Sequence, residues 1–429
     1  MTASFCAIDF GTSNSAIAVP SAQGVSLVEL EPGHRTMPTA VFYAVEGVQA
    51  HEELPRSYGR AALAAYVDGV DGRLMRSMKS VLGSALVEQS TDVGAGRAVR
   101  YLDVIAGYLR HLKQLAEREA GTELRRAVLG RPVFFVDDDP ARDTQAQAAL
   151  ETAARAVGFG EIAFQYEPIA AALDFEQQAT TEQRVLVADI GGGTSDFSIV
   201  RVGPERRRRA ERKDDILANH GVHIAGTDFD RRVELAAILP TCGYCAHGPR
   251  QGSQPPREVP SRVYFDLATW HLINTVYAPA RVAELQRLRP FYADARLHAR
   301  LMRVAQQRLG HALIALAEDA KIAVAEGGST TIDLRQVEPG LAVPLAEREA
   351  TQAVEADLQR IVEAADETLK QAGLQPQQLD ALYFTGGSTG FQPLTARIAA
   401  RFPAARVQRG DRFASVAQGL GVHAARHFG

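Results

Sequence analysis

Two stretches of the chain share one pattern of apolar and polar residues. Residues 5–10 and 186–190 are apolar runs of the kind that forms buried strands, and each carries an aspartate near its end. Each run then turns through glycine and hydroxyl residues and resumes as a second apolar stretch, at 16–19 and 197–200. Two such hairpins about 180 residues apart predict two related halves that face each other.

Elsewhere the pattern predicts strands mixed with helices. Across 101–119, apolar residues such as Val104, Ile105 and Tyr108 recur at helical spacing, which predicts a helix packed against a sheet. From 240 to 260, Gly, Pro, Cys, Arg and Ser dominate, which predicts an exposed insertion or loop. The other expected elements are strands over 24–30, 39–45, 127–136, 162–166, 330–334 and 341–344, a strand and turn over 379–390, and helices over 58–83, 146–157, 230–239 and 347–373. Residues 262–284 and 293–326 are expected to be long, helix-rich stretches.

Composition narrows the class of protein. The 429 residues are 46% hydrophobic, enough for a large core, and the length predicts roughly two to three domains. A net charge of −4 gives no electrostatic case for nucleic acid or a membrane surface. No apolar run reaches about 18 residues and no basic-then-apolar segment opens the chain, so we expect neither a membrane span nor a secretory signal. Three cysteines fit a reducing compartment, and we expect a cytoplasmic protein.

The hairpin over 189–196 carries candidate chemistry. Its glycines, Gly191 to Gly193, let backbone N–H groups approach an anion, because no Cβ stands in the way. Asp189 and Asp196 would repel a bare phosphate, and a hydrated Mg²⁺ between carboxylates and phosphate oxygens resolves that conflict. The alternative is an ordinary tight hairpin with solvated acids. The matching turn after Asp9 favours two opposed phosphate clamps around one nucleotide.

Further motifs follow in a set order. Residues 167–172 are Glu-Pro-Ile-Ala-Ala-Ala, residues 386–389 are Gly-Gly-Ser-Thr, and Lys79 opens the segment Lys-Ser-Val-Leu-Gly. With the two hairpins, these motifs make the chain from Ile8 to Gly421 resemble the nucleotide-binding domain of the DnaK-type heat-shock chaperones, within the actin-like ATPase superfamily. In detail it is similar to the shortened YegD-type relatives, which keep the ATPase domain and lack the peptide-binding domain.

The resemblance implies an α/β protein with the actin-like ATPase fold. Two lobes of duplicated ribonuclease-H-like mixed sheets, flanked by helices, would enclose a nucleotide cleft. Lobe I would span 1–180, lobe II would span 181–404, and 405–429 would return to lobe I. The expected subdivisions are a lobe I core of 1–38 and 98–180, a small subdomain of 39–97 that is shorter than in full-length chaperones, a lobe II core of 181–230 and 306–404, and a helical subdomain with the insertion at 231–305.

For the site, the resemblance implies that both hairpins wrap around the β- and γ-phosphates of ATP or ADP. Asp9 and Asp189 would hold Mg²⁺ through its waters. Lys79 would offset charge on the γ-phosphate, and Glu167 would position the attacking water while Asp189 or Asp196 helps to accept its proton. The implied catalytic residues are Lys79, Glu167, Asp189, Thr194 and Asp196. The implied nucleotide-binding residues are Gly11, Thr12, Ser13, Gly191, Gly192, Gly193, Thr194, Gly226, Thr227, Asp228, Lys321, Gly386, Gly387, Ser388 and Asp411.

Several positions depart from the family pattern. Ile322 and Gly390 stand where the family places arginines beside adenine, and Ala325 stands where it places a serine, which leaves the preference for adenine open. By spacing, Gln147 replaces the arginine that partners the family's switch proline, here Pro132. Without a peptide-binding domain, that relay would have nothing to drive. We therefore expect ATP binding without allosteric peptide capture.

Together these observations predict a DnaK-like ATP-binding protein with slow, Mg-dependent ATP hydrolysis that acts as a chaperone-like nucleotide switch. Its partners would be the nucleotide and a protein client or co-chaperone, with no membrane and no nucleic acid. Two alternatives stay open. A small-molecule, sugar-type kinase on the same scaffold would transfer phosphate to a hydroxyl, and a nucleotide-dependent scaffold or polymer-former would bind nucleotide without turnover.

Two weaker signals lie outside these motifs. Cys242, Cys245 and His247 offer soft ligands for Zn²⁺, but a single CxxC lacks the second pair that makes a structural zinc site specific. The arginine run 206–209 could bind an acidic partner. Because acids follow it, we expect a solvated hairpin tip instead.

Overall fold

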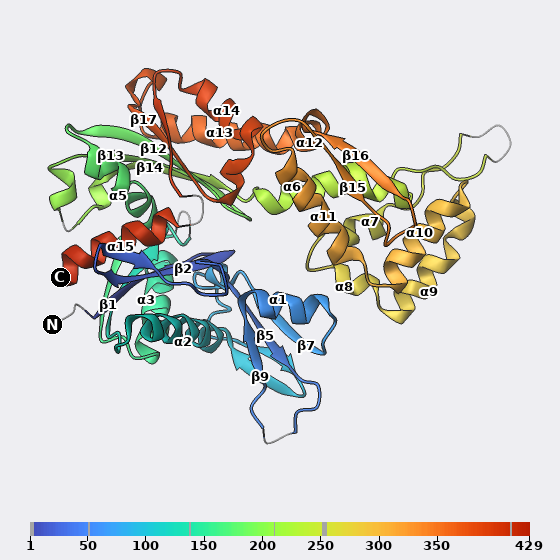
Figure 1. The fold of residues 1–429 in the computed structure, drawn as a ribbon, viewed down its shortest axis with the longest axis horizontal. Coiled ribbons are helices and arrows are strands. Elements are labelled where there is room, and N and C mark those ends of the chain that lie inside the picture. The colour runs from blue at the N-terminus through green and yellow to red at the C-terminus, as the bar shows by residue number, and fades with distance from the viewer. Residues whose placement is uncertain (1–3, 50–51, 137–138, 210, 251–254, 412–413) are drawn as a thin grey trace.

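The computed structural model describes residues 4–49, 52–136, 139–209, 211–250, 255–411 and 414–429. Three short ranges lie outside the described residues: 1–3 of the expected lobe I, 251–254 of the expected insertion and 412–413 of the expected C-terminal segment. The N-terminal part of the chain forms one body, shown in blue to teal in Figure 1, and the middle of the chain forms a second body in green to orange. The C-terminal helix returns to the first body.

Each body is built around one mixed sheet, and the two sheets have equivalent strand orders. In the first, β1 (Phe5–Phe10) pairs antiparallel with β2 (Asn14–Ser21) and parallel with β10 (Arg126–Arg131). In the second, β12 (Gln183–Ile190) pairs antiparallel with β13 (Ser195–Val202) and parallel with β17 (Ala381–Thr385). The full orders are β11-β10-β1-β2-β3 and β18-β17-β12-β13-β14, with β3 (Gly24–Leu27), β11 (Glu161–Tyr166), β14 (Ile216–Val222) and β18 (Arg406–Arg409). The predicted duplication is confirmed strand by strand.

Helices bury both faces of each sheet. One apolar cluster joins the two sheets through α4 (Glu167–Ala171) and α15 (Ser415–Phe428), which lie between them (Figure 1). The two helices approach so closely that a Cβ on Gly419 would lie 1.9 Å from the carbonyl oxygen of Ala170. The outer faces are covered by α2 (Tyr101–Ala120) and α3 (Pro140–Ala156) in the first body, and by α13 (Glu355–Gln371) and α14 (Gln392–Arg401) in the second.

A small subdomain projects from the first sheet, and here the prediction of a helix over 58–83 is wrong. The helix α1 (Gly59–Val67) is shorter, because the chain turns at Gly69 with a φ of +76°. Residues 72–76 then form a strand, β7, that pairs with β5 (Ala40–Ala44). Lys79 follows on a 3₁₀ turn, η1 (Met78–Val81). The other elements of the subdomain are β6 (Arg56–Tyr58), β8 (Ser90–Gly94) and β9 (Arg97–Arg100). The short strand β4 (Met37–Pro38) belongs to the first sheet, where it pairs antiparallel with β2.

A helical subdomain projects from the second sheet. The stretch over 293–326 is rich in helix as expected, with two helices, α10 (Ala295–Gln306) and α11 (Gly310–Ala323), separated at Arg308, whose φ is +55°. The single helix expected over 347–373 is interrupted at Val354, between α12 (Glu347–Ala353) and α13. The remaining elements are α5 (Leu173–Gln178), α6 (Gly226–Val233), a π-helical turn η4 (Glu234–Ile238), η5 (Leu239–Cys242), α7 (Arg262–Leu267), α8 (Ile273–Val276), α9 (Pro279–Arg287), β15 (Ser329–Asp333) and β16 (Ala342–Ala346).

Two further expectations need correction. The strand expected over 127–136 ends at Arg131, because Pro132 has no N–H group to continue the ladder. The segment over 240–260 is only partly exposed, since Cys242 and Val259 are buried in the core of the helical subdomain. No helix in the described part of the chain has the length and apolar character that crossing a bilayer needs.

Candidate functional site

The first hairpin turn is a tight one. It joins β1 to β2 through Gly11, Thr12 and Ser13. A Cβ on Gly11 would lie 2.1 Å from the carbonyl oxygen of Asn14, so only glycine fits at that position. The hydroxyl of Thr39 donates to the carbonyl oxygen of Gly11 at 2.8 Å. This bond fixes the turn from the neighbouring strand segment.

The second hairpin turn, Gly191 to Thr194, is held by bonds to its carbonyl groups. The backbone N–H and the hydroxyl of Thr227 both donate to the carbonyl oxygen of Gly192 at 2.8 Å. The hydroxyl of Ser388 donates to the carbonyl oxygen of Gly191 at 2.7 Å. Two of the predicted nucleotide-binding residues therefore hold the predicted phosphate turn in place.

The turns of the two sheets face each other. A Cβ on Gly192 would lie 3.1 Å from the hydroxyl oxygen of Ser13, so the hairpins from the two lobes nearly touch. The turn after β17 closes the same region. Gly386 there has a φ of +88°, and a Cβ on it would lie 2.7 Å from a carboxylate oxygen of Asp189. The structure thus brings three of the predicted nucleotide-binding turns together between the lobes.

A buried ion pair lies beside these turns. The Nζ atom of Lys79 is 2.6 Å from Oε1 of Glu167, and the two side chains are 10% and 16% exposed. Burial acts to lower the pKa of Lys79, but the negative charges of Glu167, Asp9 and Asp196 outweigh it and raise that pKa. Lys79 therefore stays a cation at neutral pH.

Three predicted carboxylates complete the cluster. Burial, reinforced by the charge of Glu167, raises the pKa of Asp9 to about 8. Burial, reinforced by Asp196, raises the pKa of Asp189 to about 7. Burial also raises the pKa of Asp196, although a hydrogen bond from the Thr194 hydroxyl opposes the change. The raised values mean that the ionised carboxylates are short of positive partners, so the cluster would take up either protons or an added cation.

Local structure aims the ion pair into this cluster. Ser77, two residues before Lys79, has a φ of +54°, a strained conformation for a residue with a side chain. The guanidinium of Arg142 holds the far end of the same segment, donating to the carbonyl oxygen of Gly83 at 2.9 and 2.6 Å. Glu167 is the first residue of α4. Sequence reasoning missed Ser77 and Arg142, because neither belongs to a motif.

Arg131 is a further residue that sequence reasoning missed. Its guanidinium donates to Oε1 of Gln147 at 2.5 Å and to a carboxylate oxygen of Asp143 at 2.8 Å. It also lies over the ring of Tyr166, at 5.1 Å from the centroid. Gln147, which stands where the family has an arginine, is thus contacted by an arginine located just before Pro132. In the sequence, the position of Arg131 directly before Pro132 was the one feature that could have drawn attention to it.

The predicted base-side residues have structural partners of their own. Lys321 is buried and forms an ion pair with Asp230, with 2.5 Å between Nζ and Oδ1. Burial raises the pKa of Asp230 to about 6. Asp228 accepts a backbone hydrogen bond at the start of α6, which is a capping role. Asp411 is exposed and lies shortly before α15 in the sequence. Ile322, the residue after Lys321, is 59% exposed.

The structure bears on the two weaker sequence features, the possible zinc ligands and the arginine run over 206–209. In the described residues, no three or more His, Cys, Asp or Glu side chains are arranged to bind a metal directly. Both cysteines of the CxxC pair are free thiols, Cys242 buried and Cys245 exposed. The expectation of a solvated arginine run is wrong for Arg206. That side chain is 13% exposed and bonds to Glu182 and Asp215.

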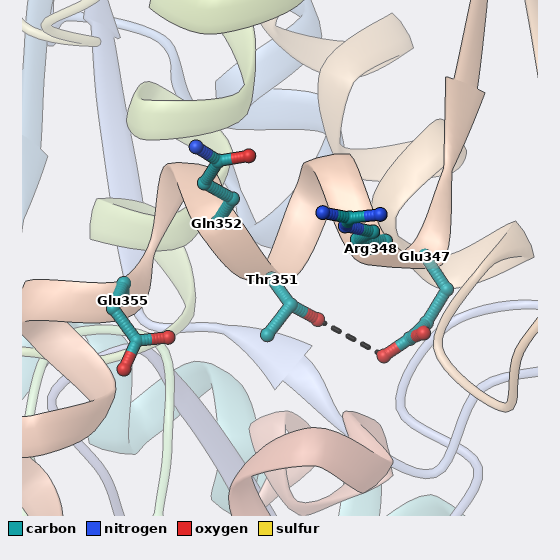
Figure 2. A pocket seen from close by; sticks show the side chains of 5 residues that line it. All are labelled: Glu347, Arg348, Thr351, Gln352 and Glu355. Carbon is teal, nitrogen blue, oxygen red and sulfur yellow. Dashed lines mark hydrogen bonds between the residues drawn. The ribbon is translucent and has the colours of Figure 1, made fainter.

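A shallow pocket lies away from the candidate site, on α12 and the first turn of α13 (Figure 2). Within it the hydroxyl of Thr351 donates to Oε1 of Glu347 at 3.0 Å. Glu355 at its edge is bound by Arg397. The pocket is lined by Glu347, Arg348, Thr351, Gln352 and Glu355. It shares no residue with the predicted site.

Opposed glycine turns on duplicated sheets define the class of two-lobed proteins with the actin-like ATPase fold. A comparison with family models matches residues 5–235 to the Hsp70 protein family, and this chain belongs to that family. The chaperone protein DnaK of Thermosipho melanesiensis is 31% identical over 229 residues, and that of Mycoplasmoides gallisepticum is 28% identical over 228 residues. Each match covers 53% of this chain but only 34% of the relative. The predicted family and fold class are confirmed.

Proposed function

We propose that this chain binds ATP or ADP with Mg²⁺ between its lobes, hydrolyses ATP slowly and acts as a chaperone-like nucleotide switch. The observation that carries the proposal is the buried pair of Lys79 and Glu167 among three carboxylates of raised pKa, opposite two glycine turns. The relatives named chaperone protein DnaK support it. A protein client or co-chaperone and a cytoplasmic location belong to the same proposal.

The carboxylate cluster fits a hydrated Mg²⁺. Asp9 and Asp189 would hold the ion through its waters. When bound, the ion supplies positive charge that offsets the phosphates and the surplus of carboxylates. The backbone of Gly11 to Ser13 and of Gly191 to Thr194 would donate to the phosphate oxygens.

The chain's own residues would then serve the hydrolytic step. Lys79, kept cationic by its acidic neighbours, would stabilise the charge that develops on the transferred phosphoryl group. Glu167, oriented by Lys79, would position the attacking water. Asp189 or Asp196 would help to accept the proton of that water.

The residues expected beside the base support only a weak preference for adenine over guanine, whereas the residues expected beside the phosphates match the family pattern better. Lys321 is already bound by Asp230, and the exposed Ile322 offers an apolar contact in place of a guanidinium. We expect GTP to bind within about tenfold of ATP, a difference of about 1.4 kcal/mol. Competition of GTP against a fluorescent ADP would measure this. Exclusion of GTP at hundredfold excess would contradict the proposed base side.

Replacing Lys79 tests the proposed hydrolysis. We expect Lys79→Ala to lower steady-state ATP turnover by about 10²-fold or more, because one transition-state charge is removed. ADP affinity should change by only a few-fold. Lys370→Ala is the matched control, since that lysine is 79% exposed. Unchanged turnover in Lys79→Ala, or transfer of phosphate to a sugar by the wild type, would contradict the proposal.

A further inference from the structure

A chain of two buried hydroxyl groups supports the first hairpin turn. The hydroxyl oxygens of Ser15 and Thr39 are 2.8 Å apart, and each residue is 1% exposed. The Thr39 hydroxyl donates to the carbonyl oxygen of Gly11, also at 2.8 Å. A hydroxyl has one proton and a carbonyl oxygen can only accept, so Ser15 is the donor in the bond between the two hydroxyls. The chain therefore runs from Ser15 through Thr39 to Gly11, and each bond polarises the next.

Thr39 holds the turn at two of its carbonyl groups. Besides the bond to Gly11, its backbone N–H donates to the carbonyl oxygen of Ser13 at 2.9 Å. The segment that carries Thr39 is itself fixed. The strand β4 directly before it pairs with β2, and the hydroxyl of Tyr108 in α2 donates to the carbonyl oxygen of Pro38 at 3.0 Å. One residue outside the sequence motifs thus anchors the turn to both β2 and α2.

The direction of the Gly11 carbonyl decides the direction of a potential ligand donor. In a planar trans peptide, the C=O of one residue and the N–H of the next point in opposite directions. Because the carbonyl of Gly11 points at Thr39, the backbone N–H of Thr12 points away from Thr39. A fixed carbonyl on one side of the turn therefore presets an N–H on the other side.

The second turn uses the same arrangement. Its carbonyl oxygens at Gly191 and Gly192 accept from the hydroxyls of Ser388 and Thr227. The N–H groups of the residues that follow these two carbonyls therefore point away from the two hydroxyls. In both turns a hydroxyl from another element sets the backbone donors that a phosphate would need.

We propose that Thr39 is a positioning residue for phosphate binding, which, with Ser15 behind it, holds the N–H of Thr12 toward the β- and γ-phosphates of a bound nucleotide. The proposal rests on the proposed function, because it concerns the same site. Thr39 is buried and uses its only hydroxyl proton on Gly11, so it acts through the turn without touching the nucleotide. A preset donor removes the cost of ordering the turn on binding, so its loss weakens affinity.

Competition of MgADP against a fluorescent ADP, on the full chain, tests this role. Thr39→Val keeps the branched shape of the side chain and removes its hydroxyl. We expect it to weaken MgADP binding by about five- to tenfold, the effect of roughly one hydrogen bond. Thr39→Ser restores the hydroxyl and should bind within about twofold of the wild type.

Thr368→Val is the matched control for stability. Thr368 is fully buried in α13 and its hydroxyl donates to the carbonyl oxygen of Ala364 at 2.7 Å, so the variant loses the same kind of bond away from the site. Both valine variants should lower the urea midpoint by similar amounts, but Thr368→Val should bind MgADP within about twofold of the wild type. Equal weakening of binding by the two variants would show general destabilisation and overturn the proposal.

Steady-state kinetics add a readout that a loss of stability would not move. We expect the KM for MgATP to rise in Thr39→Val by about the same factor as the MgADP affinity falls, with kcat within about threefold, because the turn holds the phosphates before and during the reaction. A lowered kcat at unchanged KM would overturn the positioning role.

The hydroxyl chain has a test of its own. Ser15→Ala should weaken MgADP binding by about two- to threefold, and adding it to Thr39→Val should cause no further loss, because Ser15 acts through Thr39. Additive losses would overturn the chain. If far-UV circular dichroism shows that Thr39→Val does not fold, Ser15→Ala decides, and wild-type affinity in that variant overturns the proposal.

Two outcomes separate this proposal from the proposed function. Wild-type protein that binds MgADP, with Thr39→Val binding equally tightly, would overturn the positioning role alone. Wild-type protein that binds no nucleotide would overturn the proposed function and the role of Thr39 with it.

Discussion

At the scale of single residues, the candidate site is defined by groups that are costly to bury. Asp9, Asp189 and Asp196 are carboxylates that line the space between the lobes, and loss of solvation within the fold raises the pKa of each above the usual range. Lys79 compensates only part of their charge. Groups of this kind collect at functional sites, where a ligand supplies the missing interactions. This surplus of negative charge is the physical reason for proposing a cation and not only a phosphate.

Two glycines in the hairpins allow a matched test of the phosphate turns. A Cβ on Gly193 would meet no atom within 4 Å, whereas a Cβ on Gly11 would meet the Asn14 carbonyl oxygen at 2.1 Å. We expect Gly193→Ala to leave the unfolding midpoint unchanged but to weaken ATP binding by about tenfold, because the methyl group would occupy the phosphate's place. Gly11→Ala should lower the free energy of unfolding by about 2 kcal/mol or more.

Thermal unfolding and nucleotide titration of both variants would check this pair. If Gly193→Ala binds ATP as tightly as the wild type, the second turn does not contact the phosphates.

His311 makes the stability of the folded chain depend on pH. Burial is the main cause that lowers its pKa to about 4; a backbone hydrogen bond at Trp270 opposes the change, and the charge of Arg76 acts in the same direction as burial. Tyr66 is the other titratable side chain in contact with this ring. The unfolded chain binds a proton at this histidine from about pH 6.5 downward, and the folded chain does not until near pH 4. The free energy of unfolding therefore falls as the pH drops through that window.

Between pH 7 and pH 5, we expect the free energy of unfolding of His311→Gln to fall by about 1 kcal/mol less than that of the wild type, after allowing for solvent screening. Urea unfolding at the two pH values measures the difference, with the exposed His34→Gln as control. Equal losses in His311→Gln and wild type would show that this ring is not held neutral.

At the scale of elements, the structure depends on bonds that link segments far apart in the sequence. Arg131 ends β10 and joins that strand to α3 through Asp143 and Gln147. Its guanidinium also packs on Tyr166, the residue before Glu167. One side chain thus fixes the relative position of a strand, a helix and the start of α4.

Removing this guanidinium should be costly. We expect Arg131→Ala to lower the free energy of unfolding by about 2–4 kcal/mol, because it leaves the mostly buried Asp143 without its partner. Arg125→Ala, which breaks an exposed pair with Glu123, should cause no measurable change. Urea denaturation compares the two. Equal stability of Arg131→Ala and wild type would show that the link to α3 is dispensable.

The elements also show what could be predicted from the sequence. The hairpins after Asp9 and Asp189 could be recognised, because glycine, acid and strand signals occur together in one short segment. Residues 72–76 could not be recognised as a strand, because pairing with β5 decides their structure and their local pattern does not. The αL conformation of Ser77 is likewise set by its surroundings and has no local signal.

For the candidate site, the motif residues were predicted and the groups that support them were not. Arg131 and Arg142 act through partners that are distant in sequence or are backbone carbonyls, so no spacing rule identifies them. The stacked pair of Tyr66 and Trp270 has the same origin, since the two rings are more than two hundred residues apart in the sequence.

At the scale of the whole molecule, the duplicated sheets place one glycine turn on each side of a shared site. Neither lobe holds the complete set of predicted residues, since Asp9, Lys79 and Glu167 come from one lobe and Asp189 and Asp196 come from the other. Binding of a nucleotide should therefore draw the lobes together. The central claim is that this shared site binds a nucleotide with Mg²⁺.

The most direct test is calorimetric titration of the wild-type chain with ATP, in the presence of Mg²⁺ and again in EDTA. We predict a single site whose affinity falls by at least about tenfold when Mg²⁺ is removed, because the carboxylates and the phosphates then repel each other. An absence of binding by ATP and ADP in Mg²⁺, or equal affinity with and without the metal, would contradict this account.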